Sequence, residues 1–210
     1  ASGVLKSLED WSGVEIATTG MGQGIDVTPI QMLSAYNALA NGGVYVSPQI
    51  ISSIAHSSGE KEYVATSPSR RVIGEQAARE MTQMLAAVVS RGTARKAGVP
   101  GYSIAAKTGT ARKVQPNGTY EDEEGLYRYA STVVGYFPAS APELSMIVII
   151  DEPADNFYAS ETAAPLFGNL ASWALRHYKI SPSSDLVYSA STQGDLSNLT
   201  VDETVSEGAQ

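Results

Sequence analysis

The chain has 210 residues, of which 43% are hydrophobic and 17% are charged, and its formal net charge is −8. This composition is typical of a globular protein of one domain, and the acidic balance argues against a nucleic-acid partner, which needs a basic surface. The sequence contains no cysteine, which excludes disulfides and thiolate metal sites. No apolar run reaches the roughly 18 residues that a membrane-spanning helix needs. The first residue is not Met, and we expect a piece of a longer protein.

The first part of the chain is predicted to have no regular secondary structure. Residues 5–20 are polar and irregular, with Trp11 as the only large anchor. Residues 20–24 include three glycines, but their spacing fits neither nucleotide-binding motif. We therefore expect a tight turn here and no phosphate site.

A helix is predicted from residue 28 to about residue 41. Thr28 and Gln31 form a capping-box pattern, Pro29 suits the first helical position, and the two glycines that follow residue 41 end the helix. The face expected to meet the core consists of Ile30, Leu33, Asn37 and Ala40.

The next segment is predicted to form a strand pair over residues 44–55, which Pro48 confines to a sheet edge. Residues 57–61 read as the solvated tip of a hairpin. Ser58 and Lys61 have the spacing of a serine acyltransferase nucleophile, but that chemistry needs both on one helix face. Gly59 and the neighbouring serines disfavour a helix, so we do not expect Ser58 to be a nucleophile.

The clearest helix is predicted over residues 75–91, ending at Gly92. Its apolar residues recur at helical spacing, and we expect its methionines to fill the core without any metal or cofactor role. The predicted core face consists of Ala77, Met81, Met84, Leu85 and Val88.

At least three strands are predicted in the second half of the chain, over residues 103–108, 131–137 and 144–151. The apolar run at 146–150 shows no alternation, which predicts a central strand buried on both faces. The polar segment 112–128 carries an acidic run that is typical of a solvated loop, and we expect no metal site there.

Leu166, Leu170, Trp173, Ala174 and His177 are predicted to line one face of a closing helix, with His177 near its C-terminus as a capping or surface histidine. The sequence has only two histidines, at distant positions, which disfavours a zinc site or a Ser-His-Asp triad. Residues 181–210 are rich in Ser, Asp and Glu and read as an acidic disordered tail. We thus expect a folded unit over residues 1–180.

The strand at 103–108 leads into a short segment that carries chemistry, formed by Lys107, Thr108, Gly109 and Thr110. Lysine supplies a compact cation, the threonines supply hydroxyl donors, and glycine permits close backbone approach. Such a strand edge is suited to bind the carboxylate end of an extended peptide. On its own this short motif is a weak signal.

Further blocks accompany this motif in a fixed order. They are Met21-Gly22-Gln23-Gly24, Val27-Thr28-Pro29-Ile30-Gln31-Met32, Ala38-Leu39-Ala40-Asn41-Gly42-Gly43, Val88-Val89-Ser90-Arg91-Gly92-Thr93-Ala94, Val99-Pro100-Gly101-Tyr102, Lys107-Thr108-Gly109-Thr110-Ala111, Gly135-Tyr136-Phe137-Pro138 and Ala163-Ala164-Pro165-Leu166-Phe167. Over about residues 11–178 the chain resembles the C-terminal half of the transpeptidase domain of class B penicillin-binding proteins, which cross-link peptidoglycan.

The resemblance implies an α/β (α+β) fold of the β-lactamase/transpeptidase type, with helices packed on the faces of an antiparallel sheet. It implies no cofactor and no metal. The family's Ser-x-x-Lys motif lies in a part that this chain lacks, and no Ser-x-Asn motif occurs here. We therefore expect the isolated chain to be inactive and to need the missing N-terminal half. The sheet face that this half covers in the family is expected to be exposed or packed by another chain.

The resemblance also implies roles for individual residues. Lys107 supplies positive charge, Thr108 and Thr110 donate hydrogen bonds to the substrate carboxylate, Gly109 completes the motif, and the backbone N–H of Thr110 is an oxyanion-hole donor. Further substrate-binding residues implied are Arg112, Tyr129, Phe157 and Tyr158.

The partners implied are a peptidoglycan stem peptide, β-lactam antibiotics and the cell-wall synthesis machinery, at the extracytoplasmic face of the bacterial membrane. The resemblance places the membrane anchor in an N-terminal segment absent from this chain. Two alternatives remain open: an acyl hydrolase, either a D,D-carboxypeptidase or a β-lactamase, and a non-catalytic binding or scaffolding fragment. A role in cell elongation and shape or in cell division is also left open.

Overall fold

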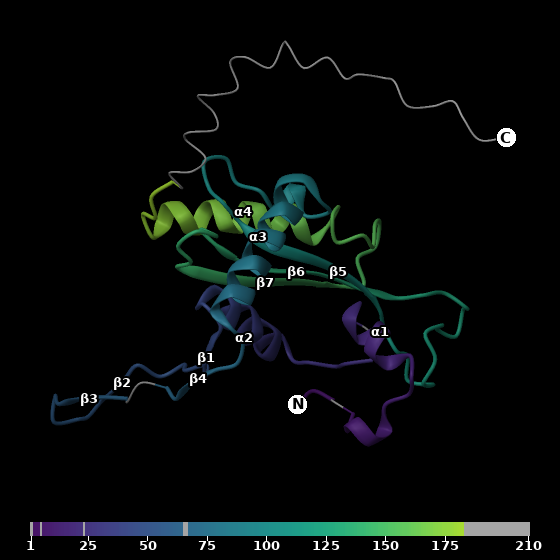
Figure 1. Ribbon diagram of the computed structural model, residues 1–210, viewed down its shortest axis with the longest axis horizontal. Coiled ribbons are helices and arrows are strands. Elements are labelled where there is room, and N and C mark those ends of the chain that lie inside the picture. Colours follow the sequence, from purple (N-terminus) through teal and green to yellow (C-terminus); the bar gives the residue numbers. More distant parts are fainter. Residues whose placement is uncertain (1, 5, 23, 65–66, 183–210) are drawn as a thin grey trace, which may run out of the picture.

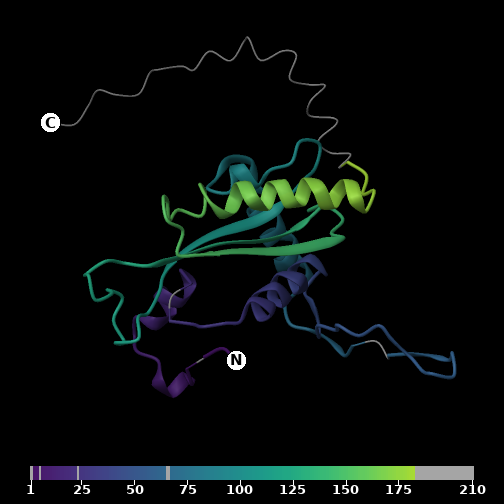
Figure 2. The same ribbon diagram turned by 180° about the vertical axis from the view of Figure 1, so that it is seen from behind.

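Figure 1 shows the computed structural model of the chain, which describes residues 2–4, 6–22, 24–64 and 67–182. A three-stranded antiparallel sheet lies between helices on its two faces, and a slender β arm extends to one side (Figures 1 and 2). All but the first two positions of the predicted tail, 181–210, lie outside the described residues. Within the described ranges no helix is long and apolar enough to cross a membrane.

The sheet consists of β5 (Ala105–Arg112), β6 (Tyr129–Phe137) and β7 (Leu144–Asp151), in the order β5-β6-β7. β6 is the central strand, and the side chains of Val133, Tyr136 and Phe137 on it are almost completely buried. The prediction that 146–150 forms a central strand was wrong, because β7 pairs only with β6 within the described part of the chain. Its run of apolar side chains consequently lies at an open edge.

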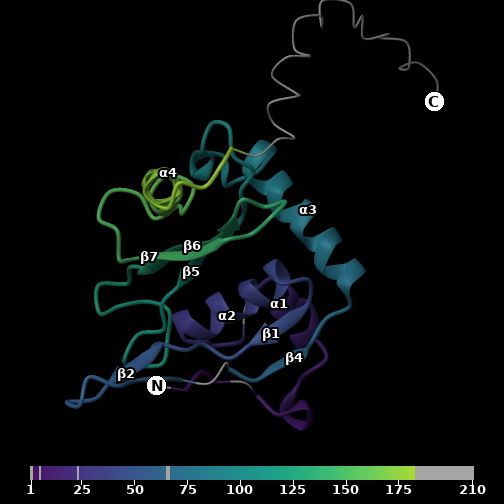
Figure 3. The same ribbon diagram turned by 90° about the vertical axis from the view of Figure 1, so that its left-hand side faces the viewer.

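The two faces of the sheet carry different helices, as Figure 3 shows. On one face, α4 (Ala163–His177) and the 3-10 helix η2 (Arg95–Ala97) cover a core that includes Ala106, Val133 and Phe137. On the other face, α2 (Pro29–Ala40) lies near a smaller core of buried residues around Tyr136. α3 (Glu75–Arg91) packs along β5 and contributes to both cores.

The capping signals that predicted α2 are present in the structure. Thr28 Oγ1 accepts a hydrogen bond from the backbone N–H of Gln31, and the Gln31 side chain interacts in turn with the backbone N–H of Thr28. The predicted core face was wrong, because the buried side chains of α2 are those of Ser34 and Ala38. Of the predicted set, Ile30 and Asn37 are exposed, and Leu33 and Ala40 are half-buried.

The predicted limits of α3 are those observed, and Gly92 follows as the C-terminal cap. Its buried side chains are those of Ala78, Leu85 and Val89, so only one residue of the predicted face, Leu85, is buried. The predicted core methionines, Met81 and Met84, are exposed.

α4 turns the opposite side to the core from the one predicted. Its buried residues are Ala163, Ala164, Phe167, Gly168, Ala171 and Leu175. Leu166, Leu170 and Trp173 are exposed, and Trp173 stacks on His177 with ring centroids 4.6 Å apart. Gly168 explains why this face of α4 is buried, because a Cβ on Gly168 would lie 2.7 Å from the carbonyl oxygen of Lys96 in η2. α4 can approach η2 this closely only where its residue at the contact is as small as Gly168.

The N-terminal part is more regular than predicted. A 3-10 helix, η1 (Leu8–Asp10), and a short α-helix, α1 (Glu15–Gly20), lie within the segment that was expected to be irregular. The hydrogen bond of the Thr18 hydroxyl to the Val14 carbonyl is one local contact that supports α1.

The predicted strand pair at 44–55 was also wrong in its pairing. β1 (Val44–Val46) pairs with β4 (Ser69–Arg71), and β2 (Ser53–Ala55) pairs with β3 (Lys61–Tyr63), both antiparallel. The arm in Figure 2 is formed by these two ladders in succession. Ser58 lies at the hairpin tip between β2 and β3, where the Gly59 N–H bonds to the His56 carbonyl, as predicted.

The pairing of β5 with β6 depends on Gly135, which lies opposite Ala106. A Cβ added to Gly135 would come 2.6 Å from the Ala106 Cβ and would collide with the carbonyl oxygen of Ala105. Gly109 on β5 differs, because the nearest atom to an added Cβ there is the Thr132 Cβ at 3.9 Å.

We predict that Gly135→Ala lowers the free energy of unfolding by about 1–3 kcal/mol, because overpacking a close strand contact forces the backbone to shift. The matched control Gly109→Ala adds the same methyl group to the neighbouring strand where there is room, and we expect a change within about 0.5 kcal/mol. Urea unfolding of the two variants measures both. Equal losses would contradict this account of the β5–β6 contact.

Candidate active site

The candidate site lies along the free edge of β5. Side chains alternate along a strand, so Thr108 and Thr110 lie on the face of Ala106, toward α4. Lys107 and Gly109 lie on the face of Ala105, toward α2. Lys107, Gly109 and Thr110 are exposed, and Thr108 is half-buried. A ligand at this edge can therefore reach a cation from one face and hydroxyl groups from the other.

Both threonine hydroxyls are held by neighbours behind the strand. The Thr110 Oγ1 accepts a hydrogen bond of 3.1 Å from the backbone N–H of Ala159, at the start of the turn into α4. The Thr108 Oγ1 lies 2.8 Å from the Thr93 Oγ1, and either hydroxyl can donate. Because an N–H can only donate, the proton of Thr110 stays available for another acceptor.

Lys107 carries a charge without a counter-ion among the described residues. Its Nζ donates to the carbonyl of Thr108 at 2.7 Å, and none of the ion pairs in the described ranges involves it. Lys113, six residues further on, is different: its Nζ lies 2.8 Å from Asp151 and 2.6 Å from Glu152. The hydrogen bonds to Asp151 and then Glu152 raise the pKa of Lys113. Lys113 thus ties the end of β5 to the end of β7, while Lys107 can serve a bound anion.

Aromatic rings gather at the C-terminal end of β5. The ring of Tyr129 stacks on that of Phe157 with centroids 4.2 Å apart, and Phe157 contacts Tyr158 at 4.4 Å. Ser131, which is completely buried, donates its hydroxyl hydrogen to the Phe157 carbonyl and so fixes this loop against β6. The three aromatic residues form one continuous cluster beside Thr110.

Arg112 joins the cluster from β5. Its Cα is paired with that of Tyr129, and its guanidinium lies over the ring of Tyr127, 4.0 Å from the centroid. The Tyr127 hydroxyl donates to Glu121 at 2.8 Å, and this hydrogen bond raises the pKa of Tyr127. The arginine is therefore held by an aromatic face, which leaves its charge for a ligand.

The acidic part of the 113–128 segment is more ordered than a solvated loop. The carboxylate of Asp122 accepts hydrogen bonds from the backbone N–H groups of Leu126 and Glu124 and from Arg128, at 2.9, 3.0 and 2.7 Å. The Leu126 N–H is the largest cause of the lowered pKa of Asp122, and the Arg128 guanidinium adds to it. The described residues bring no three His, Asp or Glu side chains together as a possible metal site.

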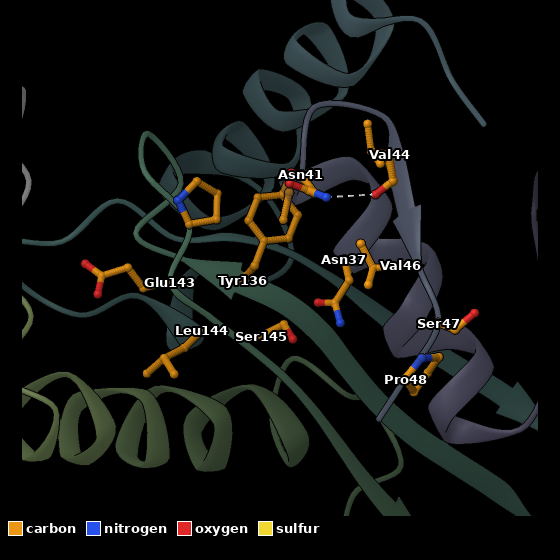
Figure 4. A pocket seen from close by; sticks show the side chains of 12 residues that line it. Asn37, Asn41, Val44, Val46, Ser47, Pro48, Tyr136, Glu143, Leu144 and Ser145 are labelled. Carbon is orange, nitrogen blue, oxygen red and sulfur yellow. Dashed lines mark hydrogen bonds between the residues drawn. The ribbon is translucent and has the colours of Figure 1, made fainter. Parts of the chain in front are cut away.

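A cavity lies away from the β5 edge. It measures about 380 Å³ and is lined by residues of α2, β1 and the end of β6, including Asn37, Asn41 and Tyr136 (Figure 4). None of the predicted site residues lines it. Within the described residues β5 pairs only with β6, so its outer edge is open.

Comparison with known proteins identifies the family of the chain. The family model described as the penicillin binding protein transpeptidase domain matches residues 1–172. The chain belongs to this family.

Named relatives agree with the family. The chain is 36% identical over 195 residues to penicillin-binding protein PbpB of Mycobacterium tuberculosis, covering 88% of the chain and 28% of that protein. It is 32% identical over 204 residues to the peptidoglycan D,D-transpeptidase FtsI of Escherichia coli, covering 96% of the chain and 31% of that protein. The chain thus spans less than a third of the length of these relatives.

Solved structures share the fold. Penicillin-binding protein 3 of Mycobacterium tuberculosis, complexed with ampicillin, superposes with a TM-score of 0.79 at 36% identity, covering 88% of this chain and 42% of that one. A peptidoglycan synthetase from Bifidobacterium adolescentis gives a TM-score of 0.76 at 28% identity, covering 87% and 32%. The predicted transpeptidase-type α/β fold is therefore confirmed.

Within this penicillin-binding family segment, the structure brings the predicted residues into one region. Lys107, Thr108, Gly109 and Thr110 lie along the edge of β5, with Arg112, Tyr129, Phe157 and Tyr158 at its end. That they bind substrate stays a prediction. Among the residues that contact this set, sequence reasoning missed Thr93 and Tyr127. Tyr127 lies two positions before Tyr129, and this spacing is the signal that points to a shared face.

We predict that the carboxyl group of Asp122 titrates below the ordinary value of about 3.9, because its charged form accepts several hydrogen bonds. A lowered pKa stabilises the folded loop above the ordinary pKa, and that stabilisation is lost as the pH falls through the lowered value. Carbon-detected NMR of the Asp122 carboxyl group measures it. Arg128→Gln is expected to raise the pKa only in part, since the Leu126 N–H remains; a return to the ordinary value would contradict the assigned order of causes.

Proposed function

We propose that this chain supplies the Lys-Thr-Gly strand of a serine D,D-transpeptidase that cross-links peptidoglycan stem peptides. The observation that carries the proposal is the open edge of β5. There the Lys107 cation has no ion-pair partner among the described residues, and the hydroxyls of Thr108 and Thr110 each have a hydrogen-bond partner behind the strand. Family membership supports it, as does the name of the Escherichia coli relative, a peptidoglycan D,D-transpeptidase.

The edge is suited to an extended peptide that ends in a carboxylate. The peptide adds to β5 as a further strand, and its terminal carboxylate accepts hydrogen bonds from Thr108 and Thr110. Such charge-assisted bonds are about twice as strong as neutral ones. Gly109 leaves room for the approaching backbone, and Arg112 adds a second cation. The rings of Tyr129, Phe157 and Tyr158 form an apolar wall for the neighbouring part of the substrate.

The chemistry is acyl transfer. A serine hydroxyl oxygen attacks the carbonyl carbon of the penultimate D-Ala, and the peptide bond to the terminal D-Ala breaks as that residue leaves with a proton. An amine of a neighbouring stem peptide then attacks the acyl-enzyme ester and releases the serine. The backbone N–H of Thr110 is proposed as one donor to the oxyanion formed in each step.

The nucleophile comes from outside this chain. The Ser-x-x-Lys and Ser-x-Asn motifs are proposed to lie in the N-terminal half of the domain, and Lys107 to face the serine of the second motif. The isolated chain is accordingly inactive. The whole protein is proposed to act with the cell-wall synthesis machinery at the extracytoplasmic face of the bacterial membrane, anchored by a segment absent from this chain.

β-Lactams are proposed to acylate the same serine. Their carboxylate rests against Thr108 and Thr110 as the substrate carboxylate does. The ampicillin and aztreonam complexes of the Mycobacterium tuberculosis relative support this proposal.

We predict that a fluorescent penicillin labels the full-length protein covalently, and that residues 1–210 alone remain unlabelled.

In the full-length protein, Lys107→Met is expected to lower the acylation rate constant by about 10²–10³-fold, as loss of an electrostatic contact to the reacting group typically does. The matched control Lys113→Met removes a lysine that is engaged by Asp151 and Glu152, and we expect it to leave the rate nearly unchanged.

Gel fluorescence and stopped-flow measurements give label and rate. Label on the isolated chain would contradict the proposed division of the site. A full-length protein that remains unlabelled would contradict the proposed function. Release of D-Ala followed by hydrolysis of the acyl-enzyme, without cross-linked product, would favour a carboxypeptidase.

A further inference from the structure

Thr93 contacts the motif strand from outside it. It lies between the end of α3 and η2, fifteen residues before Thr108, and their hydroxyl oxygens are 2.8 Å apart. The Thr93 side chain is exposed and belongs to neither hydrophobic core. Packing therefore gives no reason for a threonine at this position.

The backbone on both sides of Thr93 is fixed. The N–H groups of Gly92 and Ala94 both donate to the carbonyl of Val88, at 3.0 and 3.2 Å. A Cβ on Gly92 would lie 2.8 Å from that same carbonyl oxygen, and Ala94 is completely buried. The Thr93 hydroxyl is thus presented to Thr108 by a short turn that has little freedom to move.

The direction of the hydrogen bond matters for anion binding. A hydroxyl has one proton to donate and can accept through its lone pairs. If Thr108 donates to Thr93, it has no proton left for a carboxylate. If Thr93 donates to Thr108, then Thr108 can donate to the anion and both hydroxyls are satisfied. An anion at the edge of β5 therefore selects the second arrangement.

Thr110 has the equivalent support from a different source. The Ala159 N–H donates to its Oγ1, which leaves the Thr110 proton free. The two threonines of the motif therefore each have a hydrogen-bond partner on the α4 side of the sheet. For Thr110 this partner is a backbone donor, and for Thr108 it is the Thr93 hydroxyl, which can donate or accept and which substitution can remove.

We propose that Thr93 is a positioning residue for carboxylate binding: it donates its proton to Thr108 and so directs the Thr108 proton toward the carboxylate of the substrate or β-lactam. Thr93 itself does not touch the ligand. This inference rests on the proposed function and deepens it by adding a residue that lies outside the motif.

The test uses the full-length protein and a fluorescent penicillin with a free carboxylate. Thr93→Val removes the hydroxyl and keeps the shape, and we expect the second-order acylation rate constant to fall by about 5- to 10-fold, the usual effect of one lost hydrogen bond. Thr93→Ser keeps the hydroxyl and is expected to restore most of the wild-type rate. Thermal unfolding of each variant shows whether the fold is retained.

A double-mutant cycle separates positioning from a general structural effect. In a Thr108→Val background the hydroxyl that Thr93 orients is absent, so Thr93→Val should cause no further loss. An equal loss in both backgrounds would overturn the inference, as would a Thr93→Val rate equal to that of the wild type. Wild-type protein without label would overturn the proposed function as well, whereas label on the wild type with no Thr93 effect would overturn the inference alone.

Discussion

The close pairing of β5 with β6 is the constraint on which the site depends. Gly135 lets β5 approach so closely that no side chain fits at that point of the ladder. The register that results places Ala105 and Ala106 in the two cores on opposite faces of the sheet. Because side chains alternate, the same register sends Lys107 to one face and Thr108 to the other. The placement of the cation on one face of the sheet and of the hydroxyls on the other is thus set by Ala105 and Ala106, which directly precede the motif.

Each face then completes its part of the edge. On the α4 side, the turn after α3 and the turn before α4 each place one hydrogen-bonding group against a threonine hydroxyl, and both turns are anchored by buried alanines, Ala94 and Ala159. On the α2 side, nothing in the described part of the chain forms an ion pair with Lys107. The two hydroxyls therefore have hydrogen-bond partners in the turns next to α3 and α4.

The sequence predicted where the main helices begin and end better than which side they bury. Limits follow from local chemistry, such as the capping box at Thr28 and the glycine that ends α3, and these signals lie within a few residues. Buried faces follow from tertiary distance. In α4, alanines and Gly168 turn inward because η2 lies so close, while the larger Trp173 stays outside. Large side chains such as Phe167 still fill the core on this face, but close packing against η2 requires glycine at position 168.

For the site, the sequence motif was sufficient to place the four residues of the β5 edge, and the family resemblance added the aromatic cluster. Thr93 and Tyr127 could not be found in this way, because each acts through a contact with a residue far along the fold or across a loop. The order of strands could not be predicted either. The apolar run at 146–150 indicates that both faces of the strand are covered, but it does not say how many strands pair with it, and β7 pairs with β6 alone among the described residues.

The apolar segment 146–150 of β7 has a practical consequence when this chain is prepared by itself. Among the described residues no strand pairs with the outer edge of β7, which also carries exposed apolar side chains such as Ile149. Strand edges of this kind are templates for pairing with another molecule. The separated chain will consequently self-associate more as its concentration rises, and a short synthetic strand that binds β7 is a direct means of keeping it in solution.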